Sequence, residues 1–429
     1  MSNFSFGNIN INEYKKIFMT FIYTGFFQIL IQTLTFLSGI FLIRFLGINE
    51  YAYYTITITV LTTLTTISDS GIMGSVMSIV GSRWNDKNYL GQVIFTAQYL
   101  RRRLALLSLC IGVPILVYLL YSKNASYFNI ITHSFALVII YFLIIQSGLF
   151  ETAYKLTLHL KKLQSIQIIT QSFKAIFIIV LIYLIPLSFI AIICIIISQW
   201  LLLLLLKNKS ESFVQVSECI NEETKNELLL SIKKVLPSTI YYAFYGQITL
   251  LLISFFGNIE SVAQLGGLTR LAMLLSLVTS ILNLIVVPRF SRFENNKQEY
   301  YKKLNLIIVG LILLSLSLCL LVYIFPIPIL SILGPSFLNL EKESLLITIS
   351  SCISMINGIV YNIALVGKII VPSILIISYN TIVLIALILL FDMSKISNIL
   401  FLNIYSSIAI FILFNSFIFY KLNYIKNEN

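Results

Sequence analysis

The sequence contains little charge. Of its 429 residues, 11% are charged and 58% are hydrophobic, whereas a soluble domain carries about 25% charged residues. Apolar stretches of about 18 residues or more, each long enough to cross a hydrocarbon core about 30 Å thick, recur along almost the whole chain. This composition excludes a soluble globular domain and predicts an all-α integral membrane protein whose first partner is the lipid bilayer.

Cysteine and histidine are also scarce. The five cysteines form no CxxC pair, and His133 and His159 are the two histidines, so neither a disulfide framework nor a zinc site is expected. The chain has no P-loop, no metal-ligand cluster and no Ser–His–Asp grouping. We therefore predict no metal, no cofactor and no enzymatic activity. Without a nucleotide site of its own, the protein would not couple directly to ATP.

The formal net charge of +12 raises the question of nucleic-acid binding. Its placement argues against that partner, because there is no arginine-rich arm and no soluble basic domain. Most Lys and Arg residues lie in short loops between apolar segments, which is typical of loops that face the cytoplasm.

Hydropathy predicts about twelve transmembrane helices in two bundles of six. An N-terminal bundle at 1–206 and a C-terminal bundle at 236–429 are separated by a charged cytoplasmic linker at 207–235. The predicted spans are 17–43, 52–80, 102–121, 131–150, 165–185, 187–206, 236–256, 264–288, 304–325, 344–366, 370–390 and 397–420.

Loop charges test this count. With the N-terminus in the cytoplasm, most loop cations fall on the cytoplasmic side, including Arg101, Arg102 and Arg103. The opposite side receives Lys123, Lys342 and Lys395. Since a missed helix would reverse every later loop, the segregation predicts both termini in the cytoplasm. An even number of helices per bundle gives both bundles the same orientation, as in transporters built from parallel repeats.

Two segments carry a family resemblance. The first combines GIFLIRFLGINEYAYYTI (39–56) with SDSGI (68–72), and the second combines FFGNIESVAQLGGLTRLAMLL (255–275) with VVPRFSR (286–292). Together they resemble polysaccharide flippases of the Wzx type, within the superfamily that includes multidrug and toxic-compound extruders and the lipid II flippase. The chain departs from the pattern where IESVAQL replaces a tighter Val-Gly-x-Tyr, and it lacks the extra helix pair of the lipid II flippase.

The resemblance implies two six-helix bundles around a central cavity. It also implies a lipid-linked oligosaccharide substrate, in which a repeat unit on undecaprenyl diphosphate crosses the bacterial cytoplasmic (inner) membrane by alternating access. Such units supply O-antigen (lipopolysaccharide), capsule or exopolysaccharide synthesis, and a polysaccharide polymerase and a chain-length regulator are further expected partners.

Two other classes are open at this point. A multidrug-type exporter of small molecules shares the layout but favours an acidic cavity, whereas three cations and one acid stand inside the predicted helices here. A membrane glycan polymerase or glycosyltransferase would present a large external loop or an acidic motif. The longest predicted outer loop, roughly 326–343, is short.

Lys174 is the strongest candidate for binding the diphosphate. An ionisable group at mid-bilayer costs about 2.5–3.5 kcal/mol, so its retention suggests an aqueous surrounding. Gln164, Gln167, Gln171 and Lys174 fall within an arc of about 80° on one helix face. One interpretation is a cavity-lining face that ends in a cation, and the other is a lysine that extends to the cytoplasmic interface.

Three more ionisable residues stand inside the predicted helices or, in the case of Arg44, directly at the end of one. Arg270 and Arg44 are the other candidate cavity cations, with contacts to lipid headgroups or extension to the outer interface as the alternatives. Asp69 lies near the inner end of its helix in a run of Thr and Ser. Its candidate roles are pairing with a cation, capping a broken helix, and proton coupling.

Uncharged polar stripes follow two predicted helices. One stripe comprises Thr24, Gln28, Gln32, Thr35 and Gly39, and the other comprises Ser350, Ser354, Asn357 and Tyr361. Each stripe either lines the cavity or mediates helix packing, because small and polar residues serve both purposes. The tyrosines at 241, 242 and 245 would either stack on sugar rings or anchor the helix at the interface.

Overall fold

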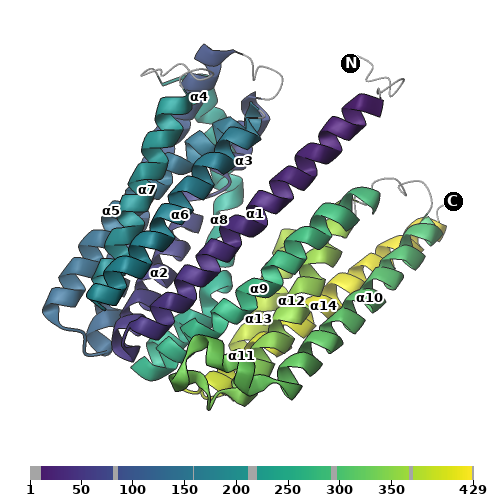
Figure 1. Cartoon of the computed structure of the whole chain (residues 1–429). Helices are drawn as coiled ribbons and strands as arrows, with labels where there is room; N and C mark the ends of the chain where they lie inside the picture. Colours follow the sequence, from purple (N-terminus) through teal and green to yellow (C-terminus); the bar gives the residue numbers. More distant parts are fainter. Residues whose placement is uncertain are drawn as a thin grey trace.

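The computed structural model describes the backbone of residues 11–80, 86–157, 159–210, 220–290, 297–366 and 371–427. These residues form long α-helices that run up and down in two bundles (Figure 1). Both chain ends lie at one end of the molecule, called here the terminal end, and the other is the opposite end. The polypeptide begins and ends at the same side because it crosses the molecule an even number of times.

The first half of the chain contains seven helical segments. They are α1 (Ile11–Phe45), α2 (Ile48–Asp69), α3 (Ile72–Val80), α4 (Lys87–Ser122), α5 (Tyr127–Leu156), α6 (Leu160–Leu184) and α7 (Ser188–Ser210). The helix α1 lies diagonally between the two bundles in Figure 1 and packs against both α6 and α9.

The second half repeats the up-and-down course. Its segments are α8 (Glu222–Phe256), α9 (Ile259–Phe290), α10 (Lys297–Ile324), α11 (Pro326–Leu333), the 3-10 turn η3 (Pro335–Phe337), α12 (Glu341–Val366), α13 (Ser373–Leu390) and α14 (Ile396–Asn427). The short α11 and η3 lie at the opposite end, within the stretch predicted as the longest outer loop.

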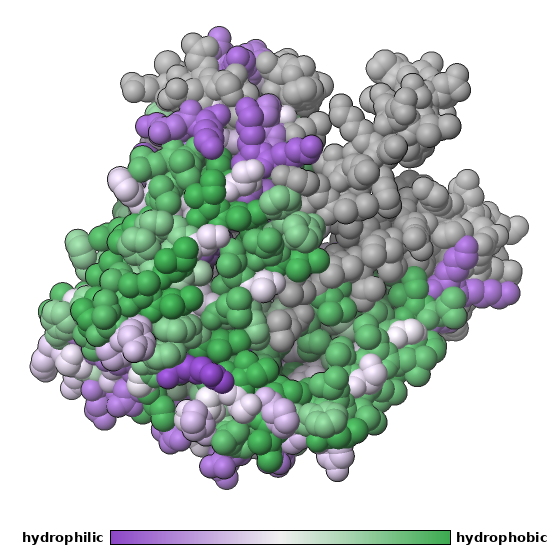
Figure 2. Space-filling model, viewed as in Figure 1, coloured by the Kyte–Doolittle hydropathy of each residue, from purple (hydrophilic) through white to green (hydrophobic). Residues whose placement is uncertain are grey.

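The all-α membrane fold predicted from hydropathy is confirmed. Within the described residues, ten helices are long and apolar enough to cross a membrane, and α13 adds a shorter apolar helix. Figure 2 shows a broad apolar belt around the visible face, with hydrophilic residues gathered toward its two ends. The belt is the surface that a bilayer would cover.

The predicted helix at 52–80 is broken in two. Ser70 has a φ of 39° and Gly71 a φ of 76°, and these values end α2 before α3 begins. A left-handed residue stops an α-helix, and glycine adopts this conformation without steric cost. The oxygen Oδ1 of Asp69 accepts a hydrogen bond from the backbone N–H of Met73 at 3.3 Å, so Asp69 caps α3.

The predicted start of the third helix was wrong. Asp86 accepts hydrogen bonds from the N–H groups of Asn88 and Tyr89, so α4 begins at Lys87 rather than at residue 102. The predicted loop residues Arg101, Arg102 and Arg103 therefore lie inside a helix. Arg102 and Arg103 are exposed, whereas Arg101 is 2% exposed.

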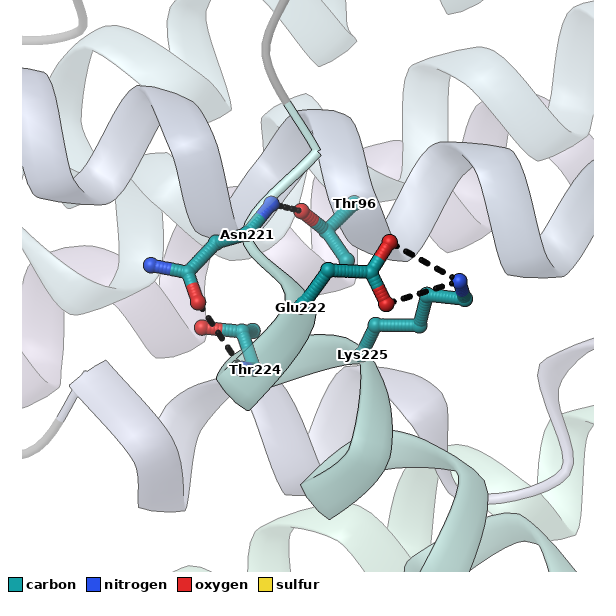
Figure 3. Close-up of polar contacts among 5 residues, drawn as sticks. All are labelled: Thr96, Asn221, Glu222, Thr224 and Lys225. Atoms are coloured by element: carbon teal, nitrogen blue, oxygen red, sulfur yellow. Dashed lines mark hydrogen bonds and ion pairs between the residues drawn. The ribbon is translucent and has the colours of Figure 1, made fainter.

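Much of the predicted linker at 207–235 is helical. Residues 211–219 lie outside the described residues, but α7 continues to Ser210 and α8 begins at Glu222. Figure 3 shows the anchor of α8 on α4, where the N–H of Asn221 donates to Oγ1 of Thr96 at 3.1 Å. The side chain of Asn221 caps the N–H of Thr224 at 3.0 Å, and Lys225 pairs with Glu222 at 2.9 Å.

The hydrophobic interior consists of several separate clusters. The largest lies toward the opposite end and joins both halves, with members such as Leu42, Ile140, Val262 and Leu400. A second cluster, at the terminal end of the first half, includes Leu149 and also takes residues from the start of α8. A third cluster joins α10, α12 and α14.

Candidate functional site

The side chain of Arg270 lies at the interface between the two halves. It comes from α9, and a methyl group built on Gly39 of α1 would lie 3.3 Å from its Cδ and Nε atoms. Gly39 therefore leaves the space through which the arginine passes. The guanidinium lies within electrostatic range of the hydroxyls of Tyr51 and Tyr54 of α2.

A cavity of about 350 Å³ opens beside Arg270 between α2, α8 and α9. Its polar lining comes from threonines on α2 and α9, from the tyrosines beside Arg270 and from Gln247. The hydroxyls of Thr55 and Thr59 donate to carbonyls one turn earlier in α2, at 2.8 Å each. Their oxygens remain able to accept hydrogen bonds from a bound molecule.

Lys174 lies within electrostatic range of Arg270, so the structure brings two of the three predicted cavity cations together. Both side chains are partly buried, and among the described residues neither has a carboxylate within 4.0 Å. Two like charges without an acidic partner create a strongly positive region at the junction of α1, α6 and α9. Such a region suits an anion.

Two glutamines on α1 and α6 have unused hydrogen-bonding capacity. The amide oxygens of Gln171 on α6 and Gln32 on α1 are buried and accept no hydrogen bond in the described structure. Buried polar atoms normally have partners, so these two oxygens are available to a ligand or to water. Gln167 is partly buried on the same helix as Gln171, whereas Gln28 is exposed.

A second cavity, of about 550 Å³, lies within the C-terminal half between α8, α9, α12 and α14. It shares the wall residues Gly246, Thr249 and Thr269 with the first cavity. Its lining carries no ionisable group except the phenol of Tyr245 and is rich in hydroxyls. The polar residues of its wall are Tyr245, Thr249, Thr269, Thr279, Ser350, Ser351, Ser354, Asn403, Ser406 and Ser407.

The predicted stripe on α12 divides between packing and cavity. Ser350 and Ser354 line the second cavity. Asn357 instead donates from Nδ2 to the carbonyl oxygen of Ser407 on α14 at 2.8 Å, and Tyr361 stacks on Phe414 with ring centroids 5.6 Å apart. The last two residues therefore mediate helix packing. On α1, the side chain of Thr24 lies outside the described residues.

Arg44 is placed differently from the other two cations. Its Nε donates to the carbonyl oxygen of Ile332 at 2.9 Å, and its Nη2 donates to that of Ser331 at 2.6 Å. Both acceptors lie in the last turn of α11, where a cation is favoured by the exposed carbonyls. Arg44 thus ties α1 to the second half at the opposite end.

Lys123 forms a comparable link. Its ammonium group, in the turn after α4, donates to the carbonyl oxygen of Gly257 between α8 and α9. Lys123 is 9% exposed, and burial lowers the pKa of its ammonium group. With Arg44, it gives the opposite end two cation–carbonyl bonds that cross between the halves.

A buried charge cluster was not predicted from the sequence. Arg101 of α4 donates from Nη1 to the carbonyl oxygen of Ile145 at 2.9 Å and packs against Gly148. Asp69 and Glu151 lie within its electrostatic range. Asp69 therefore both caps α3 and neighbours a cation. The helix-capping residue Asp86 is the sequence signal that could have shown that α4 begins before Arg101 and that Arg101 lies inside a helix.

No protein-family model matches the sequence, and no curated protein sequence matches it either. Solved structures do match. A multidrug resistance MATE family transporter of the MOP superfamily, in an inward-facing conformation, aligns over 92% of this chain and 96% of its own, with a TM-score of 0.69 and 13% identity. The lipid II flippase MurJ, in an inward closed conformation, aligns over 94% and 87%, with a TM-score of 0.69 and 14% identity.

The Vibrio cholerae MATE transporter VcmN gives a third match, over 94% of this chain and 96% of its own, with a TM-score of 0.55 and 13% identity. The chain has the MATE and MurJ fold. These neighbours are transporters and a flippase, and not enzymes. The equal TM-scores of the MATE transporter and MurJ mean that fold similarity does not separate a drug exporter from a lipid flippase, so the choice depends on the residues of the cavity.

Proposed function

We propose that this protein is a flippase for lipid-linked oligosaccharides of the Wzx type. It would move repeat units on undecaprenyl diphosphate from the inner to the outer leaflet of a bacterial cytoplasmic membrane, with both termini in the cytoplasm. The observation that carries this proposal is the approach of Lys174 to Arg270, which lines an interfacial cavity, without a carboxylate within 4.0 Å of either cation among the described residues.

The two cations match the part of the substrate that the bilayer excludes. A diphosphate cannot enter hydrocarbon, whereas the lipid tail can remain in the bilayer throughout the movement. Phosphate oxygens accept charge-assisted hydrogen bonds, and a guanidinium donates two of them in a planar fork. Arg270 would hold the diphosphate in this way while Lys174 adds a point charge.

The hydroxyl-rich second cavity supports an oligosaccharide as the remainder of the headgroup. Sugar hydroxyls and the hydroxyls of Ser350, Ser354 and Thr269 can exchange hydrogen bonds. Tyr245 adds an aromatic face at the same wall. A polysaccharide polymerase and a chain-length regulator would consume the flipped units for O-antigen, capsule or exopolysaccharide synthesis.

A multidrug-type exporter is the second candidate, favoured by the MATE fold itself. A cationic drug would meet repulsion at Lys174 and Arg270, because like charges at close range in a low-dielectric cavity interact strongly. The two candidates therefore predict opposite effects of removing Lys174 and Arg270. Transport by a flippase should be lost, whereas transport of a cationic drug should become faster.

The experiment is transport of a fluorescent undecaprenyl-diphosphate oligosaccharide in proteoliposomes. Lys174→Ala and Arg270→Ala should each reduce the rate by about 10- to 100-fold, since a charge-assisted hydrogen bond is worth about 1.5–3 kcal/mol. Arg102→Ala is the matched control, because Arg102 is an exposed cation on α4. Wild-type transport in the double variant would refute the assignment.

A further inference from the structure

Three helix starts meet around a buried histidine at the opposite end. His133 lies in the second turn of α5, Ser188 is the first residue of α7, and Glu50 lies in the first turn of α2. His133 and Ser188 are both 0% exposed, whereas Glu50 is partly exposed. Neither the cavity cations nor the fold similarity involves this group of side chains.

Hydrogen bonds join these side chains and Asn129, whose Nδ2 donates to Oε1 of Glu50 at 3.3 Å. Oε2 of Glu50 accepts from the backbone N–H of Ser188 at 2.7 Å and lies 2.5 Å from the Ser188 hydroxyl. The same hydroxyl lies 3.0 Å from Nε2 of His133. On the other side of the ring, Nδ1 lies 2.8 Å from the carbonyl oxygen of Asn129.

The positions of the protons follow from these partners. A carbonyl oxygen only accepts, so Nδ1 of His133 carries a proton. The Ser188 hydroxyl has one proton and two neighbours that could receive it. If it donates to an ionised Glu50, then Nε2 must donate to the hydroxyl oxygen, and His133 is an imidazolium.

A second arrangement satisfies the same contacts. A protonated Glu50 donates to the Ser188 hydroxyl, which in turn donates to Nε2 of a neutral His133. The two arrangements contain the same number of protons and differ only in where one of them resides. With one proton fewer, Glu50 is ionised, His133 is neutral, and the single hydroxyl proton cannot serve both partners. A buried hydrogen bond is then lost.

We propose that Glu50, Ser188 and His133 form a binding site for a single proton, open to the opposite side of the membrane through Glu50. The proton is held between a carboxylate and an imidazole that a serine hydroxyl connects. This proposal deepens the proposed flippase function, on which its coupling role rests: proton binding here would fasten the starts of α2, α5 and α7 together, and proton loss would loosen them.

The titratable groups around the cluster do not take part in the interaction between Glu50 and His133. Tyr53 of α2 meets His133 edge to face at 6.5 Å between ring centroids. Lys123, in the turn between α4 and α5, is engaged with the carbonyl oxygen of Gly257. Among the described residues, no other titratable side chain forms a hydrogen bond to Glu50, His133 or Ser188.

The arrangement also differs from a catalytic Ser–His–Glu triad. In a triad the histidine stands between the serine and the acid and takes the serine proton. Here the serine stands between the histidine and the acid, and its hydroxyl is fully buried with both partners bound. The hydroxyl therefore relays a proton and has no access to a substrate.

The chain offers a simple way to observe this proton. His159 lies at the terminal end, so His159→Gln leaves His133 as the sole histidine. Imidazole nitrogen NMR of that protein should show Nδ1 protonated throughout, and a single transition at Nε2 or, by infrared difference spectroscopy, at the Glu50 carboxyl, in the range of about pH 5 to pH 8. Glu50→Gln should abolish the transition, because an amide provides no charge to balance an imidazolium.

Ser188→Ala provides a second variant that keeps the helix start but removes the relay. In this variant, Glu50 and His133 should change protonation in two separate transitions, or in one transition with a shifted midpoint pH, while His133 stays buried. The proposal fails if neither His133 nor Glu50 changes protonation in the single-histidine protein, or if Glu50→Gln leaves the transition unchanged.

Coupling is tested separately, in proteoliposomes with a pH gradient. The gradient should accelerate lipid movement in the wild type and have no effect in Glu50→Gln, with downhill movement retained. A site that titrates without any response of transport to the gradient overturns coupling alone. Absence of lipid movement in the wild type overturns the flippase function and leaves the titration result standing.

Discussion

The two ends of the molecule are built differently. At the opposite end, one hydrophobic cluster runs through both halves, from Leu42 of α1 to Leu400 of α14. At the terminal end, the described residues form one cluster that the first half shares with the start of α8, and two smaller ones within the second half, among α10, α12 and α14 and at the start of α13. One continuous cluster therefore joins the halves at the opposite end, whereas at the terminal end the start of α8 makes the connection between their clusters.

Backbone contact strengthens the join. A methyl group on Gly266 of α9 would lie 2.7 Å from the hydroxyl of Thr55 of α2, and one on Gly267 would lie 2.3 Å from the ring of Phe337. Glycine at both positions lets α9 approach the first half and η3 closely. Arg44 and Lys123 then add polar bonds between the halves. These contacts hold the two halves together at the opposite end.

The largest effect should come from separating the halves at Gly266. Gly266→Ala inserts a methyl group into the contact with Thr55, and overpacking of this kind costs about 1–3 kcal/mol. Thermal unfolding in detergent should therefore occur at lower temperature, and cavity residue Thr269, replaced by cysteine in a cysteine-free background, should become accessible from the opposite side.

Gly310→Ala is the matched control, because a methyl group at Gly310 of α10 would meet nothing within 4 Å. It should stabilise the protein by up to about 1 kcal/mol through helix propensity. Equal behaviour of the two variants would mean that the close approach at Gly266 contributes nothing to closure.

A smaller effect should follow from breaking the bond between Lys123 and Gly257. Lys123→Met removes the charged donor and keeps the length of the side chain, and the loss of such a bond costs about 1.5 kcal/mol. The opposite end should open more often, as measured by the labelling rate of the same cysteine at position 269. Lys395→Met, at an exposed lysine of the same end, should leave the labelling rate unchanged.

At the terminal end, the anchor of α8 on α4 can be tested through Thr96. Thr96→Val keeps the shape of the side chain but leaves the N–H of Asn221 without its acceptor, which costs about 1 kcal/mol. The loss should appear in unfolding without any change in labelling from the opposite side. Thr132→Val is the control, since the Thr132 hydroxyl bonds within its own helix. A rise in opposite-side labelling would show that the two ends are not independent.

The smallest effect is expected for Lys225→Ala. Lys225 and its partner Glu222 are three residues apart in the same helix, and the Glu222 side chain is 69% exposed. Exposed pairs of this spacing contribute about 0.2–0.5 kcal/mol and weaken with salt. Unfolding at low and high ionic strength should differ from the wild type by no more than this amount, and a larger difference would indicate that the start of α8 depends on charge.

Hydropathy and loop charge were sufficient for the membrane fold, because long apolar stretches have few alternatives to a spanning helix. They were insufficient where a local feature competes with hydropathy. The break at Ser70 and Gly71 interrupts a stretch that is apolar on average, and only the candidate role of Asp69 as a helix cap pointed to it. The helix cap at Asp86 lies in a polar stretch, so hydropathy placed the start of α4 too late.

The candidate site was predictable only in part. A helix-face pattern identified Lys174, and the resemblance drew attention to Arg270, but neither could say that the two residues approach each other. The sequence also could not show that Arg44 lies apart from the other two cations, because its hydrogen-bond acceptors, the carbonyl oxygens of Ile332 and Ser331, are far away along the chain. The group of Glu50, His133 and Ser188 was equally hidden, since no sequence motif joins three residues on three helices.

The helix α8 belongs to both halves at once. Its first turns pack with Leu149 and Leu202 of the N-terminal half, whereas Thr249 in its later part hydrogen-bonds to Asn403 of α14 at 3.0 Å. Pro237 lies between these parts and lacks the N–H that would complete the helical ladder. The alternating access proposed above would require α8 to bend, and Pro237 is a position where its helical ladder lacks a hydrogen bond.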